Sequence, residues 1–182
     1  MEDLIKKLLL ELGENPKRPG LRGTPRRYSE AMKFFVSGYG ENIEKIVNGA
    51  LFPADTEGMV IIKDIETYSL CEHHLLPFFG RVHVGYIPDK HVIGLSKIPR
   101  IIDMFARRLQ VQERMGQEIC DALYEILQPK GIGIVTEMSH LCMMMRGVEK
   151  QRNIAVTSHV KGSFKRDART RQEFLDLIRM KS

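Results

Sequence analysis

The chain has 182 residues, of which 43% are hydrophobic and 28% charged, with three cysteines and no tryptophan. This length and balance are typical of one domain with a hydrophobic core, and no apolar run is long enough to span a membrane. A small, odd number of cysteines argues against a disulfide framework, and the charged first residues do not resemble a signal peptide, so we expect a protein of the cytoplasm.

The net charge of +5 is concentrated near the C-terminus. Residues 150–182 contain nine Lys and Arg but only three Asp and Glu, and the rest of the chain is close to neutral. A basic segment suits an anionic partner, either a nucleic acid or a phosphorylated small molecule, although an ordinary solvated surface explains it more simply.

The first 50 residues are expected to form a helical segment. Apolar residues at helical spacing predict an opening helix of about three turns; these residues are Leu4, Ile5, Leu8, Leu9 and Leu12. A loop rich in Gly, Pro and Arg precedes a second predicted helix, with Thr24 as its N-cap, Pro25 as its first helical residue and Gly38 at its end. The predicted buried face of this second helix consists of Tyr28, Ala31, Met32, Phe35 and Val36.

Residues 51–182 are expected to form the main domain. Apolar patterns predict strands at 59–70 and 79–87, a helix from Ser96, a helix at 112–127, and strands at 132–138 and 153–160. Thr170 and Glu173 form a predicted capping box for a last helix that ends at Ile178. The order strand-strand, helix-helix, strand-strand predicts an α+β domain with an antiparallel sheet.

The motif Cys71-Glu72-His73-His74 is the most informative part of the chain. Cys71 and His74 are candidate metal ligands, and a third, Cys142, lies far downstream beside His140. Cys-x-x-His alone is a weak signal, but its combination with the distant His-x-Cys strengthens it. Three side chains around a zinc ion leave the fourth position for water, as in catalytic sites. His73 and His140 can carry protons at neutral pH, so the motif predicts a hydrolytic centre.

Other uses of the cysteines fit less well. A nucleobase deaminase needs a Cys-x-x-Cys pair, which the chain lacks. It also needs one residue between the first metal ligand and the catalytic glutamate, whereas Glu72 directly follows Cys71. Cys120 lies within the predicted helix 112–127 without a neighbouring histidine, so we expect it in the core.

Several motifs together resemble GTP cyclohydrolase I, and the resemblance covers nearly the whole chain. They lie at residues 24–27, 71–74, 94–98, 110–114, 140–147 and 170–175. The resemblance implies the tunnelling fold, in which an antiparallel sheet carries two long helices on one face. It also implies a toroidal homo-oligomer, a decamer with active sites between subunits. The implied reaction is hydrolysis of GTP at guanine C8 to formate and 7,8-dihydroneopterin triphosphate, the first step of folate or tetrahydrobiopterin biosynthesis.

The resemblance also assigns roles at the metal site. By motif position, Cys71, His74 and Cys142 would bind one zinc ion per subunit. His73 and His140 would be the catalytic proton-transfer pair, with His140 acting at guanine N7 and His73 at the ribose.

Substrate contacts follow from the same motif positions. Glu113, with Gln112 beside it, would accept hydrogen bonds from the N1–H and amine groups of guanine. Residues expected at the triphosphate are Ser96 (also placed among the catalytic residues), Lys97, Arg100, Arg146 and, from a neighbouring subunit, Arg27. A helix N-terminus at Ser96 favours anions. Without the resemblance, each of these charges is more simply a solvated surface group.

Two alternatives to a GTP cyclohydrolase remain. The basic balance favours a metal-stabilised nucleic-acid-binding module without catalysis, but the chain lacks zinc-finger spacing and an RNA-binding motif. A relative of the same fold could instead use a nucleophilic cysteine on another pterin or deazapurine, which leaves the three histidines without a shared purpose. The leading hypothesis needs a small-molecule substrate, and neither nucleic acid nor a membrane.

Overall fold

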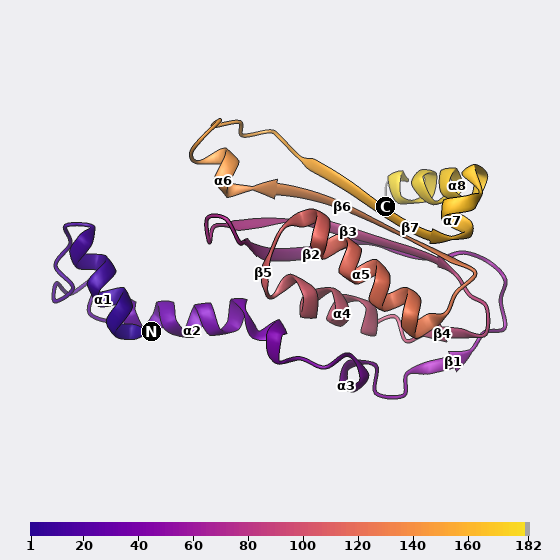
Figure 1. The fold of residues 1–182 in the computed structure, drawn as a ribbon, viewed down its shortest axis with the longest axis horizontal. Helices are drawn as coiled ribbons and strands as arrows, with labels where there is room; N and C mark the ends of the chain where they lie inside the picture. Colours follow the sequence, from indigo (N-terminus) through magenta and orange to yellow (C-terminus); the bar gives the residue numbers. More distant parts are fainter. Residues whose placement is uncertain (181–182) are drawn as a thin grey trace.

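The computed structural model describes residues 1–180, so the last two residues of the predicted main domain lie outside the described part of the chain. Its centre is a five-stranded sheet in the order β5-β2-β3-β6-β7. The strands are β2 (Val60–Cys71), β3 (Pro77–Ile87), β5 (Leu109–Gln110), β6 (Gly131–His140) and β7 (Ala155–Gly162). Neighbouring strands are antiparallel except β2 and β5, which are parallel. The predicted α+β class is confirmed, and the sheet is curled (Figure 1).

Two long helices cover one face of this sheet. They are α4 (Lys97–Ala106) and α5 (Gln112–Leu127), and the second has the bounds predicted from the sequence. Their inner residues, including Ile98, Ile102 and Leu123, are fully buried against Val84 and Ile134 of the sheet. Burial of these side chains is the main source of stability, at roughly 1.5–3 kcal/mol for each large apolar group.

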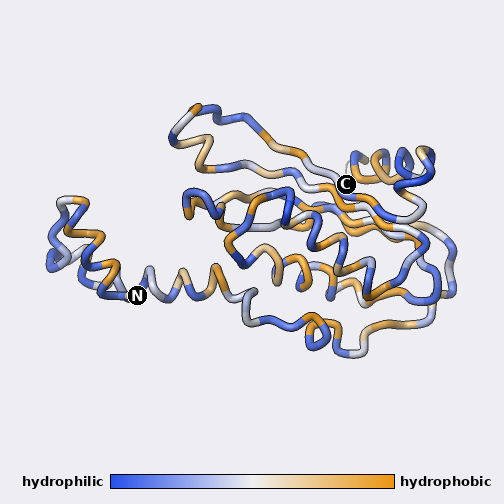
Figure 2. Tube along the Cα trace, viewed as in Figure 1, coloured by the Kyte–Doolittle hydropathy of each residue, from blue (hydrophilic) through white to orange (hydrophobic). Residues whose placement is uncertain are grey.

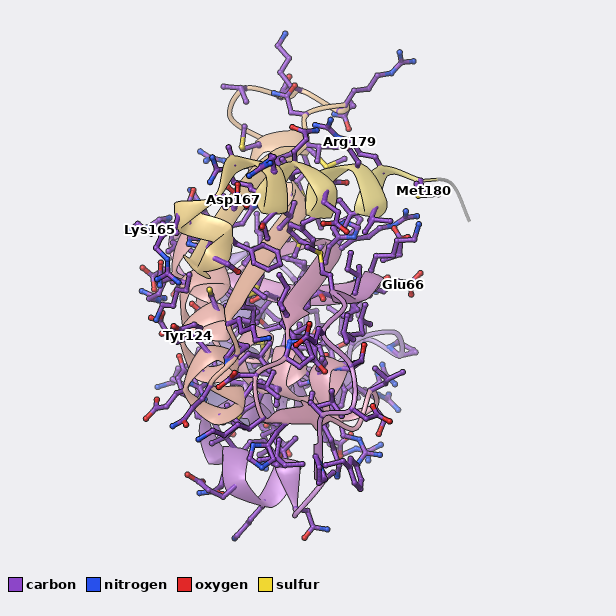
Figure 3. The ribbon with its side chains drawn as sticks, turned by 90° about the vertical axis from the view of Figure 1, so that its right-hand side faces the viewer. Glu66, Tyr124, Lys165, Asp167, Arg179 and Met180 are labelled. Atoms are coloured by element: carbon purple, nitrogen blue, oxygen red, sulfur yellow. The ribbon has the colours of Figure 1, made fainter. Side chains whose placement is uncertain are left out.

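The opposite face is covered by the C-terminal helices α7 (Ser163–Arg166) and α8 (Ala168–Arg179). Phe164 and Phe174 pack edge to face, with ring centroids 5.5 Å apart, and both are buried. They lie over Gly85 and Gly133, where a Cβ atom would approach the phenylalanine rings to between 2.6 and 3.0 Å. Figure 3 shows α8 running from Asp167 to Arg179 across the sheet, with Tyr124 of α5 on the other side.

Helix α8 begins differently from the prediction. Its N-cap is Asp167, whose carboxylate accepts hydrogen bonds from the Arg169 main chain and the Thr170 hydroxyl. The predicted capping box of Thr170 and Glu173 is therefore wrong, because Thr170 already lies inside the first turn. An aspartate at the N-cap accepts more strongly than a hydroxyl, and its charge suits the helix dipole.

The N-terminal helices α1 (Glu2–Glu11) and α2 (Thr24–Phe35) extend away from the sheet (Figure 1). Gly23 is the N-cap of α2, so Thr24 is its first helical residue and the predicted cap is wrong. The predicted buried face of α2 is also wrong for this subunit, since Tyr28 and Phe35 are 40% and 42% exposed. Figure 2 shows that apolar residues continue along α1 and α2, outside the body of the subunit.

The sequence did not predict several short elements. These are the 3₁₀ turn η1 (Ser37–Gly40), α3 (Ile43–Val47), β1 (Leu51–Pro53), β4 (His91–Ile93), β5, α6 (Leu141–Met144) and α7. They are too short to show a hydrophobic period, and β1 and β4 are stabilised by pairing with each other. Among residues 1–180, no helix is long and apolar enough to cross a membrane.

Candidate metal centre

The turn between β2 and β3 places Cys71 next to His74. Cys71 is the last residue of β2, and its carbonyl accepts hydrogen bonds from the main chains of His74 and Leu75, at 3.3 and 2.8 Å. This tight turn folds the histidines back over the strand end. Each of the atoms His73 Nδ1 and His74 Nδ1 lies 3.9 Å from Cys71 Sγ.

Strand pairing brings the third cysteine to the same place. β3 follows the turn directly, and its residue Phe78 is paired with His140 at the end of β6. The chain then enters α6, which carries Cys142. One ligating atom from each of Cys71, His74 and Cys142 lies within 4.8 Å of the others. The structure thus brings together all three side chains that the sequence suggested as ligands.

These donors fit a metal ion chemically. Burial raises the pKa of the Cys142 thiol, and the neighbouring Cys71 raises it further, while Arg146 lowers it. Two adjacent sulfur atoms resist ionising together, because the charges of two thiolates repel each other. A divalent cation removes this repulsion, and two thiolates with one imidazole are a donor set that zinc-like ions prefer. The group can therefore hold a metal ion.

The two additional histidines lie beside this group in different environments. His73 is exposed, whereas the ring of His140 is half-buried and stacks on Phe78, with centroids 4.9 Å apart and planes within 7°. Burial lowers the pKa of His140, and the nearby Glu113 carboxylate partly opposes this shift. Glu113 lies at the start of α5, directly after β5, whose residue Gln110 is paired with Cys71.

Gln112 and Arg146 are held by protein groups near the centre. The Gln112 side chain is buried, and its amide nitrogen donates to Thr136 Oγ1 and to the Ala155 carbonyl, both at 2.9 Å. It therefore fixes the start of α5 against the sheet instead of exposing its amide. Arg146 Nη1 donates to His74 Nε2 at 3.2 Å, which places this guanidinium at the metal group.

The other predicted phosphate contacts lie elsewhere in the subunit. Ser96 is the N-cap of α4 and is exposed, and Lys97 and Arg100 line a cavity of about 350 Å³ together with Lys45 and Arg107. α4 has 10 residues and so is about 15 Å long, and only its C-terminal end leads into β5 beside the metal group. Figure 1 shows that α4 begins away from the β2–β3 turn, on the side toward β4, and ends beside β5.

Arg27 lies outside the body of the subunit that carries the metal group. It is an exposed residue of α2, the helix that extends away from the sheet. Within one subunit, the structure therefore brings together the candidate ligands, His73, His140, Glu113 and Arg146, but not the group formed by Ser96, Lys97 and Arg100, nor Arg27.

The sequence did not suggest one feature of the site, the ion pair between Glu72 and Arg114. Glu72 lies inside the metal motif, and Arg114 follows Glu113, but 42 residues separate the two partners. The sequence offered one indication of a shared role, because each residue lies inside a functional motif. Only the folded chain shows that the two side chains pair. Cys120, in contrast, is fully buried in α5 as predicted, and burial raises its pKa to about 12.

Comparisons with known proteins agree over nearly the entire chain. The model of the family described as GTP cyclohydrolase I matches residues 1–179. A protein of Leptospira biflexa called GTP cyclohydrolase 1 is 59% identical over 179 residues, which cover 98% of both chains. Proteins with the same name from Gloeobacter violaceus and Methylococcus capsulatus are 53% and 54% identical, covering 100% and 98% of this chain and 85% and 96% of theirs.

Proposed function

Because the chain belongs to the GTP cyclohydrolase I family, we propose that it hydrolyses GTP at guanine C8 to formate and 7,8-dihydroneopterin triphosphate. The observation that carries this proposal is the convergence of Cys71, His74 and Cys142 within 4.8 Å, with two further imidazoles beside them. The alternative of a nucleic-acid-binding module has no support beyond the basic charge.

We assign one zinc ion to the Cys71, His74 and Cys142 side chains. When bound, zinc supplies a Lewis acid that activates water at neutral pH. The paired thiols and the imidazole support this choice over calcium or magnesium, which prefer oxygen ligands.

The chain's own residues supply the proton transfers and the recognition of guanine. We assign His140, the less exposed imidazole, to the proton at guanine N7. His73, the more exposed imidazole, is assigned to the ribose side. The Glu113 carboxylate accepts from the two donor groups of the guanine edge, and Gln112 supports this contact by holding the start of α5. These interactions are the kind that orient a substrate at the reacting atom.

The triphosphate is expected to need residues from more than one subunit. Arg146 lies at the metal group, whereas Ser96, Lys97 and Arg100 lie at the start of α4, away from that group. We therefore propose that these residues and Arg27 reach the site from neighbouring copies. The exposed apolar side chains of α2, such as Phe34 at 56% exposure, support contact with another copy.

We extend the proposal to the tunnelling fold and a toroidal homodecamer. The curled sheet with α4 and α5 on one face is the expected unit of that fold. Residues 1–50 would form the helical segment and residues 51–182 the catalytic domain. We also propose a cytoplasmic location, which suits three free thiols, and a product that enters folate or tetrahydrobiopterin synthesis.

The test of the proposed function is incubation with GTP, with formate release and pterin fluorescence as readouts. Zinc-loaded protein should release formate from GTP, and a strong chelator should abolish the activity. Cys142→Ala should lose bound zinc and activity together, because two ligands bind the ion far more weakly. Cys120→Ala is the matched control, since Cys120 is a core residue outside the cluster, and it should keep zinc and activity. No formate from the zinc-loaded wild type would contradict the proposal.

A further inference from the structure

Glu72 lies between two groups of the candidate site. One carboxylate oxygen of Glu72 accepts a hydrogen bond from Arg114 Nη2, and the other lies 3.9 Å from His73 Nε2. Glu72 thus connects the metal-binding turn to α5 through its side chain.

Arg114 is held in place by further hydrogen bonds. Its Nε donates to Gln110 Oε1, and its Nη2 also donates to the Leu109 carbonyl, both at 3.0 Å. Gln110 is 1% exposed, and its own amide donates to Glu118 at 2.8 Å and to the Phe105 carbonyl at 3.1 Å. A guanidinium with several fixed acceptors has little freedom, so it presents a defined position to Glu72.

The main chain reinforces this connection. The Glu72 N–H donates to the Gln110 carbonyl at 3.0 Å, and Cys71 is paired with Gln110 in the parallel ladder of β2 and β5. The metal-binding turn is therefore attached to the segment before α5 by main-chain and side-chain bonds together. Arg114 directly follows Glu113, the residue assigned to guanine.

We propose that Glu72 and Arg114 are positioning residues that fix the metal-binding turn, and His73 with it, relative to Glu113. The inference rests on the proposed function of the site. Water activated at the metal must meet C8 of a guanine held by Glu113, and a misplacement of about 1 Å can reduce a rate by about 100-fold. An ion pair this exposed contributes little to global stability, so its effect falls mainly on geometry.

The test compares Glu72→Gln, Arg114→Gln and the double variant with the wild type, all with saturating zinc. Each single variant should lose about 10- to 100-fold in kcat, while KM for GTP changes by less than about threefold. Bound zinc, measured with a chromophoric chelator, should stay at one per subunit. Because the two residues act as one unit, the kcat of the double variant should be within about threefold of the kcat of the less active single variant.

The control is Glu57→Gln, which removes an exposed carboxylate 3.9 Å from Lys130 and far from the motif. It should leave kcat and KM unchanged. Three results would each overturn the proposal. They are a wild-type kcat in both single variants, a loss of kcat in the double variant equal to the product of the two single losses, and loss of zinc from Glu72→Gln.

A structural measurement separates this proposal from the proposed function. Crystal structures of zinc-loaded wild type and Glu72→Gln should show the turn of residues 71–76 displaced relative to α5 in the variant only. An unchanged turn and an unchanged His73 ring would overturn the positioning role even if the wild type proved inactive on GTP. If the wild type released no formate, the proposed function would be overturned. The comparison of the two crystal structures would still decide the positioning role of Glu72.

Discussion

His83, on the central strand β3, is a buried histidine outside the candidate site. It is 3% exposed, and its Nδ1 accepts a hydrogen bond from the Asp64 main chain at 3.1 Å. Its Nε2 has no partner among residues 1–180. Burial lowers its pKa, which Glu137 and Asp64 partly oppose, so the folded protein keeps this ring neutral more strongly than the unfolded chain does.

This residue predicts an acid-sensitive component of stability. The unfolded chain takes up the proton first, near pH 6.5, so the stability due to neutral His83 is present above that pH. It is lost as pH falls from 6.5 through the lower folded-state pKa. We expect the free energy of unfolding to fall less between pH 7 and pH 5 in His83→Gln than in the wild type. Urea denaturation at both values measures this, with exposed His91→Gln as the control; identical pH dependence in all three proteins would contradict it.

At the scale of elements, α8 depends on one aromatic contact. The Phe174 side chain is 1% exposed and fills the space above two glycines of the sheet, next to Phe164. The remaining inward residues of α8, such as Leu175, are only partly buried. The helix is therefore attached to the sheet mainly through Phe174.

We expect Phe174→Ala to lower the free energy of unfolding by about 3–5 kcal/mol, because it leaves a cavity that the glycines cannot fill. Phe52→Ala provides the matched control, since Phe52 is 53% exposed on β1, and it should cost less than about 1 kcal/mol. Chemical denaturation at one fixed protein concentration measures both. Equal losses in the two variants would show that α8 does not depend on this contact.

At the scale of the whole molecule, the residues proposed for the triphosphate lie apart from the metal group within one subunit. The metal group lies where β2, β3 and β6 meet, and Lys97 and Arg100 lie at the end of α4 that is away from it. We propose that a triphosphate whose guanine is at the metal contacts the α4 of another copy. An assembly in which one copy's α4 meets another copy's metal group resolves this separation.

Mixed assemblies test that arrangement. Cys142→Ala and Arg100→Ala subunits should each be nearly inactive alone. They are co-expressed and purified by two tags. About a quarter of the sites should then combine the intact metal group of an Arg100→Ala subunit with the intact α4 of a Cys142→Ala subunit. We therefore expect formate release near that fraction of the wild type. Activity no greater than the sum of the separate variants would contradict a site shared between subunits.

The sequence alone determined the elements that have a clear hydrophobic period. The bounds of α5 and the approximate spans of the four long strands followed from local spacing, which depends on residues near each other in the chain. The motifs also marked Cys71, His74 and Cys142, because side chains that bind metals are chemically distinctive. The roles of these residues remain proposals.

Only the tertiary structure decided which distant residues meet. The exposed face of α2 and the contact between Glu72 and Arg114 depend on packing or on partners far along the chain. The pairing of Phe78 with His140 brings Cys142 to the β2–β3 turn, and the length of α4 carries Lys97 away from it. Local spacing contains no information about such separations, because they arise when the strands pair and the helices pack on the sheet.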